Sequence, residues 1–278
     1  MVAVMAFGGE NAESYYDEGL TASVKGDIPL AIACFEKALA ADPNMTAAAH
    51  QLGKCAMRTG DWSRAVQLLT RVVRARPQQI PPRLDLGVAL LESGKIENAR
   101  AVFGEVLAAE PNNPRALLGF AQIEFAQGNW QGAAAFAERS LAVSGPNFAG
   151  LFLLGRAAKL KGDLPGSQAA LSQADALLEK SLEANPSQPE PHFLRGELHF
   201  AREDFVSAID CYRAAESRMS RDGVYSAYGI TFQLCDVWAK LGMCYHRLNK
   251  NDQARELGAR VLSIDPHHKV GQFLNSLT

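Results

Sequence analysis

A period of 34 residues constrains this chain more than any other feature of its sequence. Glycines recur at that interval, at Gly26, Gly60, Gly94, Gly128 and Gly162. Alanines and prolines recur in the same step, at Ala31, Ala65, Ala99 and Ala133, and at Pro43, Pro77 and Pro111. A fixed period of this length is typical of stacked helical hairpins, in which each unit contacts only its neighbours. The repeat therefore predicts an all-α array.

Local signals within each repeat predict two helices joined by a tight turn. In the first repeat, Gly26 supplies the left-handed residue that ends one helix, and Asp27 begins the next. Pro29 is tolerated in the first turn of that second helix, where its missing N–H is not needed. Pro43 then ends the helix, so each repeat is expected to form one helix-turn-helix hairpin.

The last repeat carries the pattern of a known family. A W-x2-L-G-x2-Y spacing is formed by Trp238, Leu241, Gly242 and Tyr245, and is followed by Ala254 and Pro266. Together with the five glycines in phase, these residues resemble the tetratricopeptide repeat (TPR) family over about residues 12–278. The resemblance implies an all-α, right-handed superhelical solenoid of about seven units. A short segment at 269–277 is expected to form a C-terminal capping helix.

The resemblance also gives a reason for small residues at two places of each repeat. The eighth and twentieth places hold Gly19, Gly53, Gly87, Ala121, Gly155, Gly196 and Gly242, and Ala31, Ala65, Ala99, Ala133, Ser167, Ala208 and Ala254. In the family, the two helices of a hairpin approach most closely at these places. A larger side chain would overpack the contact, which typically costs about 1–3 kcal/mol.

The regular step breaks in the fifth repeat. Its closing proline arrives late, at Pro186, so its second helix is expected to be about two turns longer than the others. The proline-rich segment 186–191 predicts a semi-rigid linker. The predicted organisation is an N-terminal extension over 1–11, repeats one to five over 12–187, and repeats six and seven over 188–278.

An insertion near 218–234 precedes the seventh repeat. It contains Tyr225, Tyr228 and Phe232, whose spacing suits one face of a helix, and Gly229 interrupts it. We therefore expect this insertion to extend the first helix of repeat seven.

Composition gives no reason to expect a nucleic-acid or membrane partner. The 28 basic and 30 acidic residues give a formal charge of −2. The chain has no apolar run long enough for a membrane span, and the apolar run at 2–7 lacks the flanks of a signal peptide, which favours a cytoplasmic protein. The five cysteines form no C-x-x-C pair and are expected to be buried, reduced side chains.

Catalytic and metal-binding patterns are not found in the sequence. Gly94-Lys95 lacks the rest of a phosphate-binding loop, and there is no G-x-S-x-G or H-E-x-x-H. The adjacent His267 and His268 cannot share one helical face and are interpreted as a solvated turn. We therefore expect no enzyme activity, no metal and no cofactor.

A partner protein or peptide is the expected ligand. In the family, the fifth, ninth and twelfth places of each first helix face a concave groove. The candidate peptide-binding residues at these places are Tyr16, Lys54, Leu84, Val88, Leu118, Gln122, Phe125, Phe152, Arg156 and Lys159. They predict apolar anchoring, with Arg156 and Lys159 selecting an acidic group. The family's carboxylate clamp for chaperone tails requires Lys, Asn and Arg residues that its places here do not hold.

The expected function is a non-enzymatic interaction scaffold or adaptor. Two alternatives remain open at this point: a self-assembling scaffold, which could be a homo-oligomer through its insertions, and a regulatory subunit of a larger complex that uses its convex face.

Overall fold

A computed structural model describes residues 11–221, 223–228 and 230–278. Contacts between residues divide the chain into two compact bodies, Met1–Gly119 and Phe120–Thr278. We call them the N-terminal body and the C-terminal body, and the division falls within one helix. The sequence predicted a different boundary, between residues 187 and 188, which separates repeats one to five from repeats six and seven. That boundary stays a prediction.

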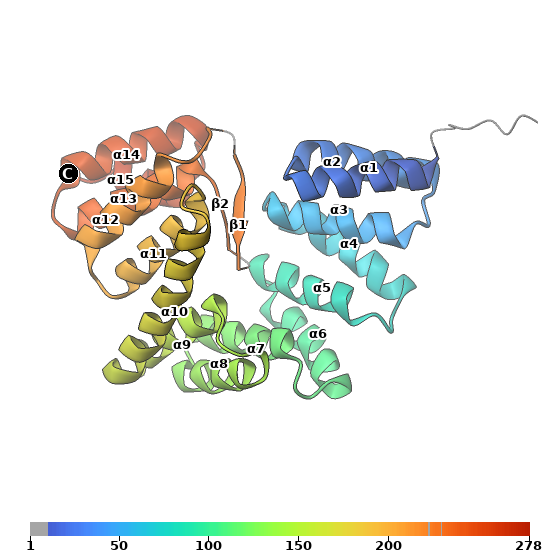
Figure 1. Ribbon diagram of the computed structural model, residues 1–278, viewed down its shortest axis with the longest axis horizontal. Helices are drawn as coiled ribbons and strands as arrows, with labels where there is room; N and C mark the ends of the chain where they lie inside the picture. The colour runs from blue at the N-terminus through green and yellow to red at the C-terminus, as the bar shows by residue number, and fades with distance from the viewer. Residues whose placement is uncertain (1–10, 222, 229) are drawn as a thin grey trace, which may run out of the picture. The chain divides into compact units, whose positions relative to one another are not determined.

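Hairpins of sequential helices build the N-terminal body, as Figure 1 shows. Its helices are α1 (Ala12–Lys25), α2 (Ile28–Ala41), α3 (Thr46–Arg58), α4 (Trp62–Ala75), α5 (Ile80–Glu92) and α6 (Ile96–Ala109), and α7 (Pro114–Ala126) begins in it. Within each repeat the two helices pack on each other, and α2 and α4 also pack on the helix that follows. The predicted helix-turn-helix repeat is confirmed here.

The C-terminal body continues the repeat but contains two strands (Figure 1). Its elements after α7 are α8 (Trp130–Ser144), α9 (Phe148–Leu160), α10 (Leu164–Ala184), α11 (Pro189–Ala201), α12 (Phe205–Glu216), β1 (Tyr225–Ala227), β2 (Ile230–Phe232), α13 (Leu234–Arg247), α14 (Asn251–Ile264) and α15 (Lys269–Asn275). One core runs through it, from Phe148 to Leu274. The capping helix predicted at the end of the chain is α15, which packs on α13 and α14.

The turn inside each repeat requires a left-handed residue. Gly26 has φ 81°, and the Asp27 side chain accepts a hydrogen bond from the backbone N–H of Leu30, as expected for a helix start. Two repeats have no glycine at this place. Glu203 and Asn249 adopt φ 64° and 59° there, so the fold imposes the turn even on residues that enter this region less readily.

The small residues mark close approaches, as predicted. A Cβ built on Gly87 would lie 2.6 Å from the ring of Phe103, and one on Gly119 would lie 2.5 Å from the same ring. Phe103 is therefore held between the backbones of two successive repeats. In the C-terminal body, Gly196 makes the same approach to Tyr212, at 2.5 Å. The glycines persist because these rings leave no room for a side chain.

The break in the fifth repeat is partly as predicted. Helix α10 has 21 residues, which confirms the lengthened second helix. The prediction of a semi-rigid linker over 186–191 is wrong for its second half, because Pro189 and Pro191 belong to the first turn of α11. Proline suits the start of a helix, where its N–H has no partner to lose. Only residues 185–188 connect α10 to α11.

The insertion before repeat seven is not a helical extension, and that prediction is wrong. Strands β1 and β2 pair antiparallel, with Tyr225 opposite Phe232 and Ala227 opposite Ile230. This register places Tyr228 directly after the end of β1. Aromatic and β-branched residues around a glycine are typical of a hairpin, and this signal outweighs the three-and-four spacing that suggested a helix.

Candidate interaction site

The predicted residues of the N-terminal body are spread over four helices, α1, α3, α5 and α7, and differ in exposure. Tyr16 on α1 is half-buried against Phe35, with ring centroids 5.9 Å apart, and Lys54 on α3 is exposed. On α5, Val88 is half-buried but Leu84 is only 4% exposed, so Leu84 offers almost no surface to a ligand.

A charged network on these helices was missed by sequence reasoning. Asp85 on α5 is 7% exposed, and its two oxygens contact His50 Nε2 at 2.8 Å and a guanidinium nitrogen of Arg115 at 2.6 Å. Burial alone would raise the pKa of Asp85, but the hydrogen bonds from His50 and Arg115 outweigh it and lower that pKa. The three residues stand in three successive repeats, and their charges are satisfied within the protein.

Three predicted residues of the C-terminal body lie in a row on α9. Phe152, Arg156 and Lys159 follow Phe148 at steps of four, four and three residues, which places them on one side of the helix. The rings of Phe148 and Phe152 stack with centroids 5.4 Å apart. The structure therefore places the predicted apolar anchor and the predicted cations along one stripe, although Phe152 is only 9% exposed and Phe148 is fully buried.

Arg156 is the central residue of this row. Its guanidinium lies 4.5 Å from the ring centroid of Phe125 on α7 and 5.4 Å from that of Phe152. Desolvation by these neighbours lowers the pKa of the guanidinium, and the nearby charge of Glu197 opposes the shift; arginine nevertheless stays protonated in proteins. Among the residues that the structure describes, no carboxylate lies within ion-pair distance of Arg156.

The row opens into a pocket with a volume of about 350 Å³, which we call the inner pocket. It is lined by Phe152, Arg156, Lys159, Leu160, Glu197, Phe200, Ala201, Glu203, Phe205, Lys240 and Arg247. These residues come from α9, from α11 and the turn after it, from the start of α12, and from α13. Repeats five, six and seven thus contribute to one site.

Hydrogen bonds fix most of the charges in the inner pocket. Lys159 Nζ donates to the backbone oxygen of Ala201 and to Glu203 Oε1, each at 2.8 Å. Glu197 accepts from Lys240 Nζ at 2.8 Å and from the Tyr212 hydroxyl at 2.5 Å. Both acids are therefore already engaged by partners within the protein.

The remaining charge in the inner pocket is positive. Four cations face two carboxylates, and Arg247, like Arg156, contacts a ring rather than an acid, with its guanidinium 5.4 Å from the centroid of Phe205. Guanidinium groups held against aromatic rings keep their N–H donors for a carboxylate or another oxyanion. The arrangement can bind an acidic group.

Several residues of the inner pocket were absent from the predicted set. Glu203, Phe205, Lys240 and Arg247 do not stand at the fifth, ninth or twelfth place of a first helix. They enter because the turn after α11 and the last part of α13 also reach the pocket. Leu118 and Gln122, which were predicted, are half-buried on α7 and do not line it.

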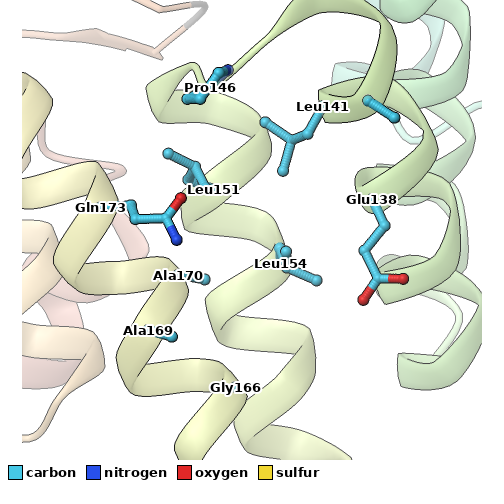
Figure 2. A pocket seen from close by; sticks show the side chains of 10 residues that line it. Glu138, Leu141, Pro146, Leu151, Leu154, Gly166, Ala169, Ala170 and Gln173 are labelled. Atoms are coloured by element: carbon cyan, nitrogen blue, oxygen red, sulfur yellow. The ribbon is translucent and has the colours of Figure 1, made fainter.

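A second cavity, of about 370 Å³, lies among α8, α9 and α10 (Figure 2). Figure 2 shows Leu141, Leu151 and Leu154 on its walls, with Ala169 and Ala170 on α10 opposite. The two α9 leucines lie on a different side of that helix from Phe152 and Arg156. This outer cavity is mostly apolar, with Glu138 and Gln173 at its edge.

The described residues show neither a metal site nor a membrane-spanning helix. No group of three His, Cys, Asp or Glu side chains in the described part of the chain is arranged to hold a metal ion. Within the same residues, no helix combines the length and the apolar character that crossing a bilayer requires.

Sequence relatives extend over about half of the chain. It is 30% identical over 155 residues to "Cellulose synthase 1 operon protein C" of Komagataeibacter xylinus, covering 50% of this chain and 11% of the relative. It is 33% identical over 140 residues to "TPR repeat-containing protein PA4299" of Pseudomonas aeruginosa, covering 49% and 54%. The matched regions thus span about half or less of the length of these curated relatives.

Solved structures share the fold over a longer range. A tetratricopeptide repeat protein from Parabacteroides merdae aligns with a TM-score of 0.60 at 15% identity, over 96% of this chain and 98% of that one. MamA from Desulfovibrio magneticus aligns with a TM-score of 0.53 at 20% identity, over 62% and 97%. These likenesses show an all-α repeat solenoid.

Sequence models of one family match most of the chain. Three models described as tetratricopeptide repeat match residues 25–86, residues 84–147 and 152–223, and residues 236–268. The repeats matched in this way include the hairpins that build both bodies. The TPR fold is that of protein-interaction scaffolds. This chain belongs to the tetratricopeptide repeat family.

Proposed function

We propose that this protein is a non-enzymatic adaptor that binds an acidic segment of a partner protein in the inner pocket. The observation that supports the proposal is the state of Arg156. Its guanidinium is held by two phenylalanine rings, while the neighbouring acid Glu197 is engaged by Lys240 and Tyr212. A cation positioned in this way is available to a carboxylate from outside.

The surroundings of Arg156 favour such binding energetically. Its side chain is oriented before the ligand arrives, so less conformational entropy is lost on binding than for a free surface arginine. The rings of Phe125 and Phe152 also exclude water from one side of the guanidinium, which strengthens a hydrogen-bonded ion pair. Lys159 adds positive charge nearby but is already bonded to Glu203, so its contribution is smaller.

Direct binding and capture with charge-reversed variants test this proposal. Arg156→Glu is compared with Arg139→Glu, because Arg139 is also an exposed arginine beside a ring, Phe136 at 5.5 Å, but on α8 and outside the inner pocket. Partners captured from a lysate by the wild-type chain would be identified, and their acidic segments synthesised as labelled peptides. Fluorescence anisotropy should show at least a tenfold loss of affinity for Arg156→Glu and little change for Arg139→Glu.

Equal affinity of both variants for every captured segment would contradict the proposal. Circular dichroism must show unchanged helix content in both variants, so that a loss of binding is not a loss of fold.

A self-assembling scaffold is the second candidate, and the outer cavity favours it. Its lining is mostly apolar, with leucine, alanine and proline side chains (Figure 2), as is typical of interaction surfaces. Ala169 lines it from an exposed place on α10, so Ala169→Glu would put a charge at the contact without disturbing the core. Sedimentation should show a concentration-dependent mass for the wild type and a monomer for the variant. A monomeric wild type would eliminate this candidate.

A further inference from the structure

The β1–β2 hairpin places an aromatic side chain on the first residue of the α9 row. The ring of Tyr228, at the tip of the hairpin, lies with its centroid 5.5 Å from that of Phe148. Phe148 stacks on Phe152, and Phe152 in turn contacts Arg156. One unbroken series of contacts therefore leads from the hairpin tip to the free guanidinium in the inner pocket.

The base and the tip of the hairpin are held very differently. Phe232 at the base is 1% exposed, and its ring stacks on Phe193 of α11 with centroids 3.9 Å apart. Tyr228 at the tip is 47% exposed. A two-stranded hairpin has little stability of its own, so the tip depends on what its side chains contact. The tip can therefore leave its contact while the base remains part of the core.

The backbone at the tip has an unusual conformation for an aromatic residue. Tyr228 has φ 53°, a left-handed conformation that glycine and asparagine adopt easily and that costs a bulky aromatic residue free energy. Strain of this kind persists only where surrounding contacts compensate it, and it clusters at functional sites. The ring contact that Tyr228 makes is with Phe148.

We propose that Phe148 and Phe152 form an aromatic subsite for the partner segment, which Tyr228 occupies in the free protein. This inference rests on the proposed function and specifies its ligand. The partner carries a large apolar or aromatic side chain that displaces Tyr228, next to the acidic group that binds Arg156. The position of Tyr228 shows which kind of side chain the subsite accepts. The positive charge of the adjoining Arg156 favours an acidic group next to that side chain in the partner.

The spacing along α9 sets the distance between these two features of the partner. Phe148 and Arg156 are separated by eight residues of helix, or about 12 Å at 1.5 Å per residue. An extended segment covers about 3.3 Å per residue, so its aromatic and acidic residues should be roughly three or four positions apart.

A first experiment needs no partner. The dye 8-anilinonaphthalene-1-sulfonate combines aromatic rings with an anion, as the ligand proposed here does. Tyr228→Asn removes the ring but keeps a residue that tolerates the left-handed turn, and Tyr228→Phe keeps the ring as a matched control. We expect dye fluorescence to rise several-fold for Tyr228→Asn alone, and to fall again when Arg156→Glu is added. Equal fluorescence of the Asn and Phe variants would overturn the inference.

A second experiment uses two blocked pentapeptides, each made in both chain directions. One has phenylalanine and glutamate at its ends with three serines between them, and the other has serine in place of the phenylalanine. We expect Tyr228→Asn to bind the phenylalanine peptide about threefold to tenfold more tightly than the wild type, with no gain for the serine peptide. An equal gain for both peptides, or none for either, would contradict the aromatic subsite.

The two proposals can fail separately. If Arg156→Glu leaves the affinity for both peptides unchanged, the acidic site is wrong, whatever Tyr228 does. If Arg156→Glu abolishes binding but Tyr228→Asn and Tyr228→Phe behave alike, only the subsite is wrong. A second copy of the chain is the other possible occupant of the subsite, and sedimentation of Tyr228→Asn tests it. Dimerisation of this variant would show that the subsite binds a second copy, and would overturn the assignment to a partner segment.

Discussion

The first helices of repeats in both the N-terminal and the C-terminal body carry charged residues, but the two bodies use them in opposite ways. In the N-terminal body, Asp85 is buried between His50 and Arg115, and its two oxygens are bonded to both. In the C-terminal body, Arg156 rests on phenylalanine rings, and no described carboxylate pairs with it. The first arrangement stabilises neighbouring repeats, and the second leaves a charge for a ligand.

This difference teaches that a charge on the first helix of a repeat does not by itself determine a role. A buried carboxylate between two bases contributes stability because its bonds are made when the protein folds. An arginine on aromatic rings contributes little to stability, since its strongest possible bonds are still unmade. Substitutions should therefore separate the two bodies: those in the N-terminal network should change unfolding, and those in the C-terminal row should change binding.

The largest expected effect concerns the packing that both bodies share. Phe103→Ala removes the ring held between Gly87 and Gly119, and it should lower the free energy of unfolding by about 3–5 kcal/mol. Urea denaturation followed by circular dichroism would measure this loss. A cost below about 1 kcal/mol would mean that the hairpins do not depend on this close contact.

Breaking the Asp85 network should have the next largest effect. Asp85→Ala removes two hydrogen bonds to basic groups from a buried place, and it should cost about 2 kcal/mol in the same measurement. Asp210→Ala is a suitable control, because Asp210 is an exposed acid on α12 that lies away from this network. Similar losses for both variants would contradict the stabilising role of the network.

Acid should weaken the same network. The pKa of Asp85 is lowered in the folded protein, so its contribution is fully present above the unfolded-state pKa of about 3.9 and is lost as the pH falls through the folded value. Asp85→Asn cannot titrate, so its unfolding free energy should fall less than that of the wild type when the pH is lowered from 5 to 3. Parallel pH profiles for the two proteins would show that Asp85 is not responsible.

The smallest effect on stability is expected for the residue that matters most for binding. Arg156→Ala loses only contacts with rings, and it should change the unfolding free energy by about 1 kcal/mol or less. The same substitution should remove most of the affinity for an acidic segment. A large loss of stability would place Arg156 with Asp85 as a structural residue and remove the contrast between the two bodies.

Much of the candidate site could be predicted from the sequence, but not all of it. The choice of the fifth, ninth and twelfth places of each first helix placed Phe152, Arg156 and Lys159 together, because all three stand on one side of a single helix. It could not supply Lys240 and Arg247, since these residues stand at other places of the seventh repeat. Nor could it show that Leu84 is buried, because periodicity gives the face of a helix and not what packs against it.

The sequence by itself determined the framework. The 34-residue period, the turn glycines and the small residues at the eighth and twentieth places specify the hairpins through local conformation and contacts between adjacent helices, which are short-range effects. Tertiary structure decided what no period encodes. It folded the insertion into a hairpin, placed the ring of Tyr228 against Phe148, and set Arg156 against phenylalanine rings with no acid of the described residues paired to it. These features depend on contacts between residues far apart in the chain, and such contacts are settled only by packing in three dimensions.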